Sequence, residues 1–287
     1  MTILFFGMVV SLIALIFLGN TTSLLMVPPT TPEQFLAGMP YSTFSFLGQD
    51  RVLIQPSSTF FVTLLGVLMI LLGVVFLNNQ KGQRSRYLWG IGMVLWGVSA
   101  IVAGTSYQAF GYELKCRGQE LCLFTSTWEL AYMLITAYSI NYLVAATGYT
   151  SAGATGRKWM VRFAIADSIA YTAYILIGAI LPIKFLVTYE GFMAFIGANF
   201  LLMFFMNIRF YRIHHDALNK KLIQVWLGFL LVNIGYFAFL FGGFGASMYQ
   251  ASGLWFNEND ALHVLLIAWS AFIYFAFRDE DMDVSAG

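Results

Sequence analysis

The stretch TFFVTLLGVLMILLGVVFL, residues 59–77, contains no charged residue. A helix of this length covers about 30 Å, which is the thickness of the hydrocarbon core of a bilayer. Because backbone N–H and C=O groups cannot stay unpaired in lipid, such a run must be helical. Similar apolar runs lie at 3–27, 88–110, 125–149, 159–181, 185–208, 222–248 and 260–277. The sequence therefore predicts an all-α, polytopic membrane helix bundle with about eight transmembrane helices.

The composition excludes most soluble classes of protein. The 287 residues are 59% hydrophobic and only 10% charged, whereas a soluble domain carries about 25% charged residues. The net charge is +1 and there is no long basic tract, so no nucleic-acid partner is expected. Membrane lipids are the expected partners, and other membrane-protein subunits stay open as partners.

The pattern of runs and loops divides the chain into four parts. Residues 1–27 are interpreted as a retained transmembrane anchor, because they lack a basic n-region and a small-residue cleavage site. Residues 28–58 hold five of the six prolines and are expected to form an exterior loop. Residues 59–278 make a seven-helix transmembrane core, and residues 279–287 form an acidic cytoplasmic tail.

The distribution of positive charge predicts the orientation in the membrane. Eleven lysines and arginines fall on one side: Lys81, Arg84, Arg86, Arg157, Lys158, Arg162, Arg209, Arg212, Lys220, Lys221 and Arg278. Four fall on the other side: Arg51, Lys115, Arg117 and Lys184. Cytoplasmic loops carry the excess of positive charge. Both termini are therefore expected in the cytoplasm, with the protein in the cell inner or plasma membrane.

Both cysteines lie in one short polar loop, Cys116-Arg-Gly-Gln-Glu-Leu-Cys122. The orientation above puts this loop outside, where disulfides persist. We expect Cys116 and Cys122 to be joined, and two free thiols are the alternative. A redox function would need a CxxC motif, which this loop lacks.

Polar side chains at three span ends predict a binding site near the outer face. Ionisable groups in hydrocarbon cost a few kcal/mol or more, so each is a functional candidate. The ligand-binding candidates are Ser106, Tyr107, Gln108, Glu129, Glu190, Asn259, Asp260 and His263. Among them, Glu129, Asp260 and His263 are the candidates for catalysis. The alternative is structural: Asp260 caps its helix and His263 makes one buried hydrogen bond.

A second polar cluster is expected in the cytoplasmic half of the bundle. Its members are Asn141, Arg162, Asp167, Asn199, Asn207 and Asn233. We expect Asp167 either to pair with Arg162 or to accept hydrogen bonds from the asparagines. Proton or ion transport would use such a cluster, and hydrogen bonding between helices is the structural alternative. His214 and His215 are interpreted as surface residues.

Three short segments resemble one known superfamily. The segment from Phe256 to Val264, FNENDALHV, looks like the start of the last helix in the alkaline ceramidase and progestin/adipoQ-receptor (CREST) superfamily, and the segment from Thr125 to Met133 looks like the opening of its third core helix. The end of the third run, Gly104 to Gln108, falls where that family keeps a serine and a histidine. The resemblance implies a seven-helix core preceded here by an extra anchor helix.

The resemblance fails at the metal site. The family holds zinc with three histidines, and the matching positions here are Gln108 or a neighbour, Asn259 and His263. Amide side chains are poor zinc ligands. A site of His263, Glu129 and Asp260 would favour a harder ion or none. A retinal protein is also excluded, because the last run has no lysine for a Schiff base.

The sequence favours two functions over proton or ion transport through Asp167, because no broken helix or paired carboxylate relay is visible in it. The first is a polar, non-catalytic site that binds a lipid or amphiphile, or a structural or assembly subunit, with no cofactor. The alternative is a metal-dependent hydrolase of lipid amides or esters, in which zinc or another metal activates water.

Overall fold

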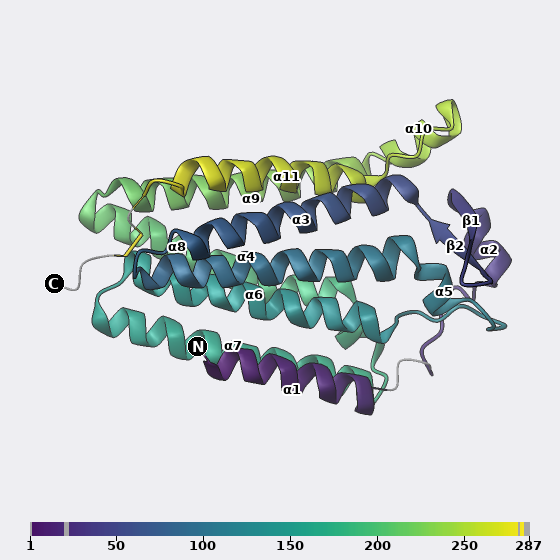
Figure 1. Ribbon diagram of the computed structural model, residues 1–287, viewed down its shortest axis with the longest axis horizontal. Helices are drawn as coiled ribbons and strands as arrows, with labels where there is room; N and C mark the ends of the chain where they lie inside the picture. The colour runs from purple at the N-terminus through teal and green to yellow at the C-terminus, as the bar shows by residue number, and fades with distance from the viewer. Residues whose placement is uncertain (1, 20–22, 281, 284–287) are drawn as a thin grey trace.

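The computed structural model describes residues 2–19, 23–280 and 282–283, which form a bundle of long helices with a small cap at one end (Figure 1). Seven of the helices in the described residues are long and apolar enough to cross a membrane. They are α3 (Pro56–Asn78), α4 (Arg84–Ala103) with the π-helical turn η2 (Gly104–Ala109), α6 (Thr127–Ser151), α7 (Ala154–Ile180), α8 (Tyr189–His214), α9 (Ala217–Phe241) and α11 (Glu258–Phe277). The structure confirms the predominantly helical fold.

The first helix, α1 (Thr2–Leu18), packs on α6 and α7 but is shorter than the predicted run 3–27. Residues 20–22 of that run lie outside the described residues. Beyond them the backbone pairs with another loop instead of continuing a helix. The N–H of Met26 donates to the carbonyl of Cys122 at 3.1 Å, and the N–H of Phe124 donates to the carbonyl of Leu24 at 2.8 Å. Apolar composition alone therefore overestimated the length of α1.

The predicted exterior loop 28–58 folds into part of the cap. It contains the short helix α2 (Pro32–Ala37) and a hairpin of β1 (Tyr41–Phe46) and β2 (Gln49–Ile54). The two turn residues, Leu47 and Gly48, both have positive φ, at 51° and 74°. This is the turn geometry that matches the twist of a hairpin. The sequence analysis did not predict these strands.

Three shorter elements complete the chain. They are α5 (Gly111–Lys115), the 3-10 turn η3 (Lys184–Val187) and α10 (Phe244–Ser252). The end of the bundle that carries α2, the hairpin and α5 is called the cap end below (Figure 1).

Glycines allow the backbones of helices α3 and α4 to come into direct contact. A Cβ on Gly97 would lie 2.4 Å from the carbonyl oxygen of Gly66, and a Cβ on Gly73 would lie 2.6 Å from that of Gly90. Small residues allow this close packing, which replaces the hydrophobic driving force that is absent between helices in lipid.

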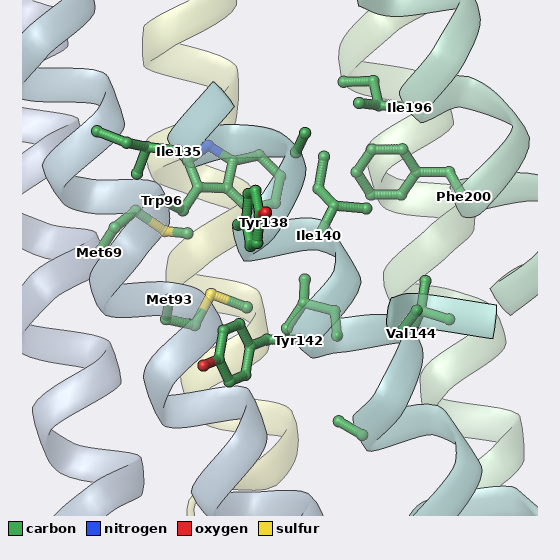
Figure 2. Close-up of a cluster of buried hydrophobic side chains, with 14 of the residues drawn as sticks. Met69, Met93, Trp96, Ile135, Tyr138, Ile140, Tyr142, Val144, Ile196 and Phe200 are labelled. Atoms are coloured by element: carbon green, nitrogen blue, oxygen red, sulfur yellow. The ribbon is translucent and has the colours of Figure 1, made fainter. Parts of the chain in front are cut away.

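Helix α6 is the central helix, and its neighbours bury the whole of its apolar stretch. Its side chains interleave with those of α4 and α8, as Figure 2 shows for Trp96, Ile140 and Phe200. Polar residues on α6 must therefore find partners inside the protein. Ser139, for example, donates to the carbonyl of Gly92 on α4 at 2.7 Å.

Candidate functional site

A cavity of about 320 Å³ extends from the cap end toward the middle of the bundle, between α3, α4, α6, α8, α9 and α11. Its inner wall is apolar and includes Trp96, Ile140, Ile196 and Phe200, whose side chains are drawn in Figure 2. Its polar lining residues concentrate at the cap end: Tyr107, Gln108, Tyr132, Tyr189, Tyr236, Asn259 and His263. The cavity is therefore amphipathic, with a polar mouth region and an apolar interior.

A π-helical turn sets the direction of two of these side chains. In η2 the N–H of Phe110 donates to the carbonyl of Thr105 at 2.8 Å, a spacing of five residues. The wider turn places Tyr107 and Gln108 on the cavity wall. Such π-turns occur often at functional sites. Ser106 does not line the cavity, because its hydroxyl donates to the carbonyl of Val102 at 2.9 Å.

Two polar atoms in the cavity wall lack hydrogen-bond partners within the described part of the chain: Gln108 Oε1 and His263 Nδ1. The Gln108 side chain is well buried, with 7% of the residue exposed. Buried polar groups are almost always paired, and an unpaired one costs about 1–3 kcal/mol. Two unpaired polar atoms on residues that line one cavity are an arrangement that a ligand could complete.

The sequence analysis missed three of the four tyrosines in this wall. Tyr132 packs edge-on against Tyr107, with ring centroids 5.5 Å apart. Tyr189 and Tyr236 line the same cavity from α8 and α9. Tyrosines near span ends are also typical of the membrane interface, so no sequence signal separated these from an interfacial belt.

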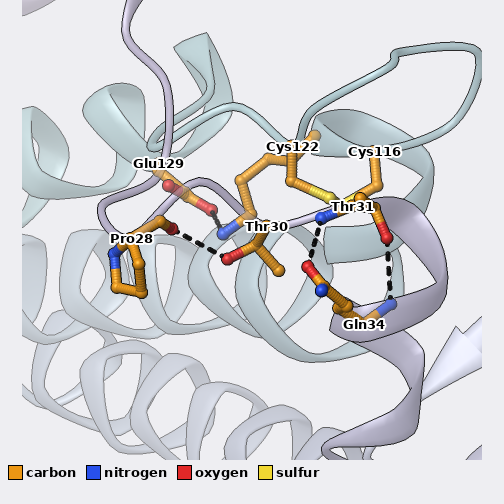
Figure 3. Close-up of a disulfide and its surroundings, with 8 residues drawn as sticks. Pro28, Thr30, Thr31, Gln34, Cys116, Cys122 and Glu129 are labelled. Carbon is orange, nitrogen blue, oxygen red and sulfur yellow. Dashed lines mark hydrogen bonds and ion pairs between the residues drawn. A yellow bond between two sulfur atoms is a disulfide. The ribbon is translucent and has the colours of Figure 1, made fainter.

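Glu129, expected in this site, is engaged elsewhere. Its Oε1 lies 2.8 Å from Lys115 Nζ, and its Oε2 accepts a hydrogen bond from Thr125 at 3.0 Å. Figure 3 shows the Glu129 side chain in the cap, near the disulfide. Glu129 also completes the capping box of α6 with Ser126. These contacts tie α5 to the start of α6, so Glu129 is an anchor of the cap.

Asp260 follows the structural alternative and caps α11. Its Oδ2 accepts the N–H of Asn257 at 3.0 Å and the hydroxyl of Ser57 at 3.4 Å. Glu190 is exposed at the start of α8. Within the described ranges, no group of three or more histidine, cysteine, aspartate or glutamate side chains is placed to hold a metal ion. Glu129, Asp260 and His263 therefore do not fit a zinc site.

The second polar cluster is smaller than predicted. Asp167 Oδ2 accepts hydrogen bonds from Asn141 Nδ2 at 2.9 Å and from Asn199 Nδ2 at 2.8 Å, which joins α6, α7 and α8. Arg162 is exposed and is not a hydrogen-bond partner of Asp167. Asn233 was wrongly placed in this cluster: it lies nearer the cap end of α9 and lines the cavity.

Asn207 belongs to a third group that the sequence analysis did not separate. Its Nδ2 donates to Ser151 at 2.8 Å and to Asn219 Oδ1 at 2.9 Å, while its Oδ1 accepts from Trp226 Nε1 at 2.8 Å. All four side chains are buried. This network joins α6, α8 and α9 at the end opposite the cap.

The predicted disulfide between Cys116 and Cys122 is confirmed (Figure 3). The loop that it closes also pairs with the chain that follows α1, since the N–H of Cys122 donates to the carbonyl of Thr30 at 2.8 Å. The disulfide is fully buried in the cap.

Glu113 is the electrostatic centre of the cap. It accepts hydrogen bonds from Arg51 at 3.0 Å, Arg117 at 2.6 Å and the N–H of Val52 at 2.9 Å. Burial alone would raise the pKa of the Glu113 carboxyl, but these three hydrogen bonds outweigh burial and lower its pKa. An ionised Glu113 therefore holds the hairpin against α5.

Comparisons with protein-family models, with curated proteins and with solved structures found no match.

Proposed function

We propose that this chain is an integral membrane protein that binds a lipid or amphiphile in the cavity between α3, α4, α6, α8, α9 and α11. The observation that carries the proposal is the amphipathic lining, with Gln108 Oε1 and His263 Nδ1 unpartnered at one end and Trp96 and Phe200 at the other. Ligand sites are mostly apolar, with a few placed polar groups that orient the ligand. This cavity has both parts.

We also propose the arrangement in the membrane. Seven spans come from the long helices. Helix α1, at 17 residues, is the eighth; its length of about 25 Å is short for a span, and local thinning of the bilayer accommodates such mismatch. The eleven-to-four charge bias supports cytoplasmic termini and an exterior cap, and a disulfide in the cap is consistent with an oxidising exterior.

The likeness to the ceramidase-like superfamily is retained as a proposal about the core fold only. Its support is that η2 and the start of α11 bring Gln108, Asn259 and His263 to one cavity. Metal-dependent hydrolysis is not proposed, because Glu129 and Asp260 are committed to an ion pair and a helix cap.

A cavity-filling variant tests the binding function. Ala100 lines the cavity, whereas Ala166 is exposed on α7. We expect wild type and Ala166→Phe to bind a radiolabelled decyl-chain alcohol with equal affinity in lipid nanodiscs. Ala100→Phe is expected to weaken binding at least tenfold. Equal binding by all three proteins would exclude this cavity as the site, and absent binding by wild type would favour the structural-subunit role.

A further inference from the structure

We infer that the cavity selects an uncharged, single-chain amphiphile whose head group donates hydrogen bonds. The inference rests on the proposed function and adds the chemistry of the ligand. It follows from three features of the lining: the absence of aspartate, glutamate, lysine and arginine among the described lining residues, two unpartnered hydrogen-bonding atoms at the cap end, and the volume.

The first feature is charge. No aspartate, glutamate, lysine or arginine stands among the lining residues that the structure describes. The basic and acidic side chains next to the cavity, Lys115 and Glu129, are paired with each other at 2.8 Å. A phosphate or carboxylate head group would lose its hydration without gaining the arginine or lysine partner that such groups use. A head group without charge avoids this cost.

The second feature is a pair of buried side-chain atoms, Gln108 Oε1 and His263 Nδ1, that have no hydrogen-bond partner in the described residues. Gln108 Oε1 has no donor in the described structure. Asn233, whose Nδ2 donates to the carbonyl of Phe229 at 2.8 Å, also lines the cavity. His263 Nδ1 is unpartnered and accepts a hydrogen bond when the proton is on Nε2. A ligand with hydroxyl or amide N–H groups supplies the missing donors, whereas a simple ester does not.

The third feature is size. A cavity of about 320 Å³ lies at the lower limit of the roughly 300–1,000 Å³ that small-ligand sites occupy. One short chain with a small head group meets this limit, and a two-chain lipid exceeds it. The aromatic wall of Trp96, Phe200 and Phe229 closes the inner part, where Phe200 and Phe229 stack with centroids 4.2 Å apart.

The experiment compares three probes with the same ten-carbon chain on the full-length protein in nanodiscs. Monodecanoylglycerol has two hydroxyl donors, methyl decanoate has none, and decanoate is charged. Each is tested on wild type, on Gln108→Leu, and on the matched control Gln119→Leu, whose glutamine is exposed in the disulfide loop. Each probe partitions equally into the bilayer around all three proteins. The ratio of one probe's affinities for two of the proteins therefore measures binding at the site alone. Thermal unfolding verifies that each variant folds.

We expect wild type and Gln119→Leu to bind monodecanoylglycerol at least tenfold more tightly than methyl decanoate or decanoate. Gln108→Leu should lose most of this preference and keep its affinity for methyl decanoate. Equal affinity for all probes in wild type, tightest binding of decanoate, or an unchanged preference in Gln108→Leu would overturn the inference while leaving amphiphile binding intact. Displacement of the probe by a didecanoyl glycerolipid at equal concentration would overturn the single-chain assignment. Absence of binding by every probe to wild type would overturn the proposed function as well.

Discussion

Lys115 Nζ lies 2.8 Å from Glu129 Oε1, and their side chains are only 6% and 1% exposed. The pair connects the cap to the central helix of the bundle. The Lys115 ammonium also lies over the ring of Tyr107, 5.1 Å from its centroid, and Tyr107 lines the cavity. The cap and the cavity therefore share a wall.

Lys115→Met is expected to destabilise the protein by about 3–5 kcal/mol, because removing one partner leaves the other charge buried and unpaired. Thermal or denaturant unfolding in detergent measures the change. The double variant Lys115→Met, Glu129→Gln should recover most of the loss, since glutamine keeps the capping box and carries no charge. A double variant as unstable as Lys115→Met alone would contradict this account of the ion pair.

The disulfide gives a second prediction. Cys116 and Cys122 are six residues apart, and closing so short a loop stabilises by roughly 2 kcal/mol through the unfolded state. The double variant Cys116→Ser, Cys122→Ser should therefore unfold at a lower temperature in detergent. Reducing agent should lower the unfolding temperature of wild type but leave that of the variant unchanged. An unfolding temperature of wild type that does not respond to full reduction would exclude a stabilising role.

The lowered pKa of Glu113 makes the cap sensitive to acid. Because this pKa is lower in the folded protein than the ordinary value of about 4.3, the stabilisation is complete above that value. It is lost as the pH falls through the lowered folded pKa. We expect wild type to be more stable than Glu113→Gln at neutral pH, and the difference in unfolding temperature to shrink below about pH 4. A difference that stays constant down to about pH 3 would show that Glu113 acts without its charge.

The contact between α3 and α4 predicts a large effect at one glycine. Gly97→Leu would force a side chain into the backbone of Gly66, where even a Cβ would lie 2.4 Å from the carbonyl oxygen. We expect a loss of folded protein, or a destabilisation of several kcal/mol from overpacking. Gly197→Leu is the control, since a Cβ on Gly197 would meet no atom within 4 Å. Comparable stability of the two variants would mean that the helices pack less closely.

Local features of the sequence predicted the long helices and the disulfide because each depends on residues close together in the chain. Run length alone indicates a helix in lipid, and the cysteines are in one loop. The hairpin was not predicted, although Gly48 marks its turn. Apolar and polar residues alternate too little along its two strands to indicate a β-structure. The end of α1 was missed because residues 24–26 pair with residues 122–124, a contact that no local pattern reports.

The candidate site was only partly predictable for the same reason. Gln108, Asn259 and His263 were grouped because antiparallel spans bring their ends to one depth, and all three line one cavity. Glu129 was placed with them because its partner, Lys115, was counted only as a loop charge. Asn233 was assigned to the wrong depth because span boundaries read from composition shift by several residues.

The last prediction concerns Asp167, whose Oδ2 accepts amide hydrogens from both Asn141 and Asn199 near the middle of the bundle. Hydrogen bonds to a charged acceptor are worth about 1.5–3 kcal/mol when desolvated, although bonds between helices in membranes average nearer 0.6 kcal/mol. Asn199→Leu should therefore destabilise wild type by about 1–2 kcal/mol. In an Asp167→Leu background the asparagine has already lost its acceptor, so the same substitution should cost much less. A double-mutant cycle measured by unfolding in detergent gives the coupling between the two side chains. Additive effects would show that the bond contributes nothing to stability, whereas a coupling of about 1 kcal/mol would establish Asp167 as a joint between α7 and α8.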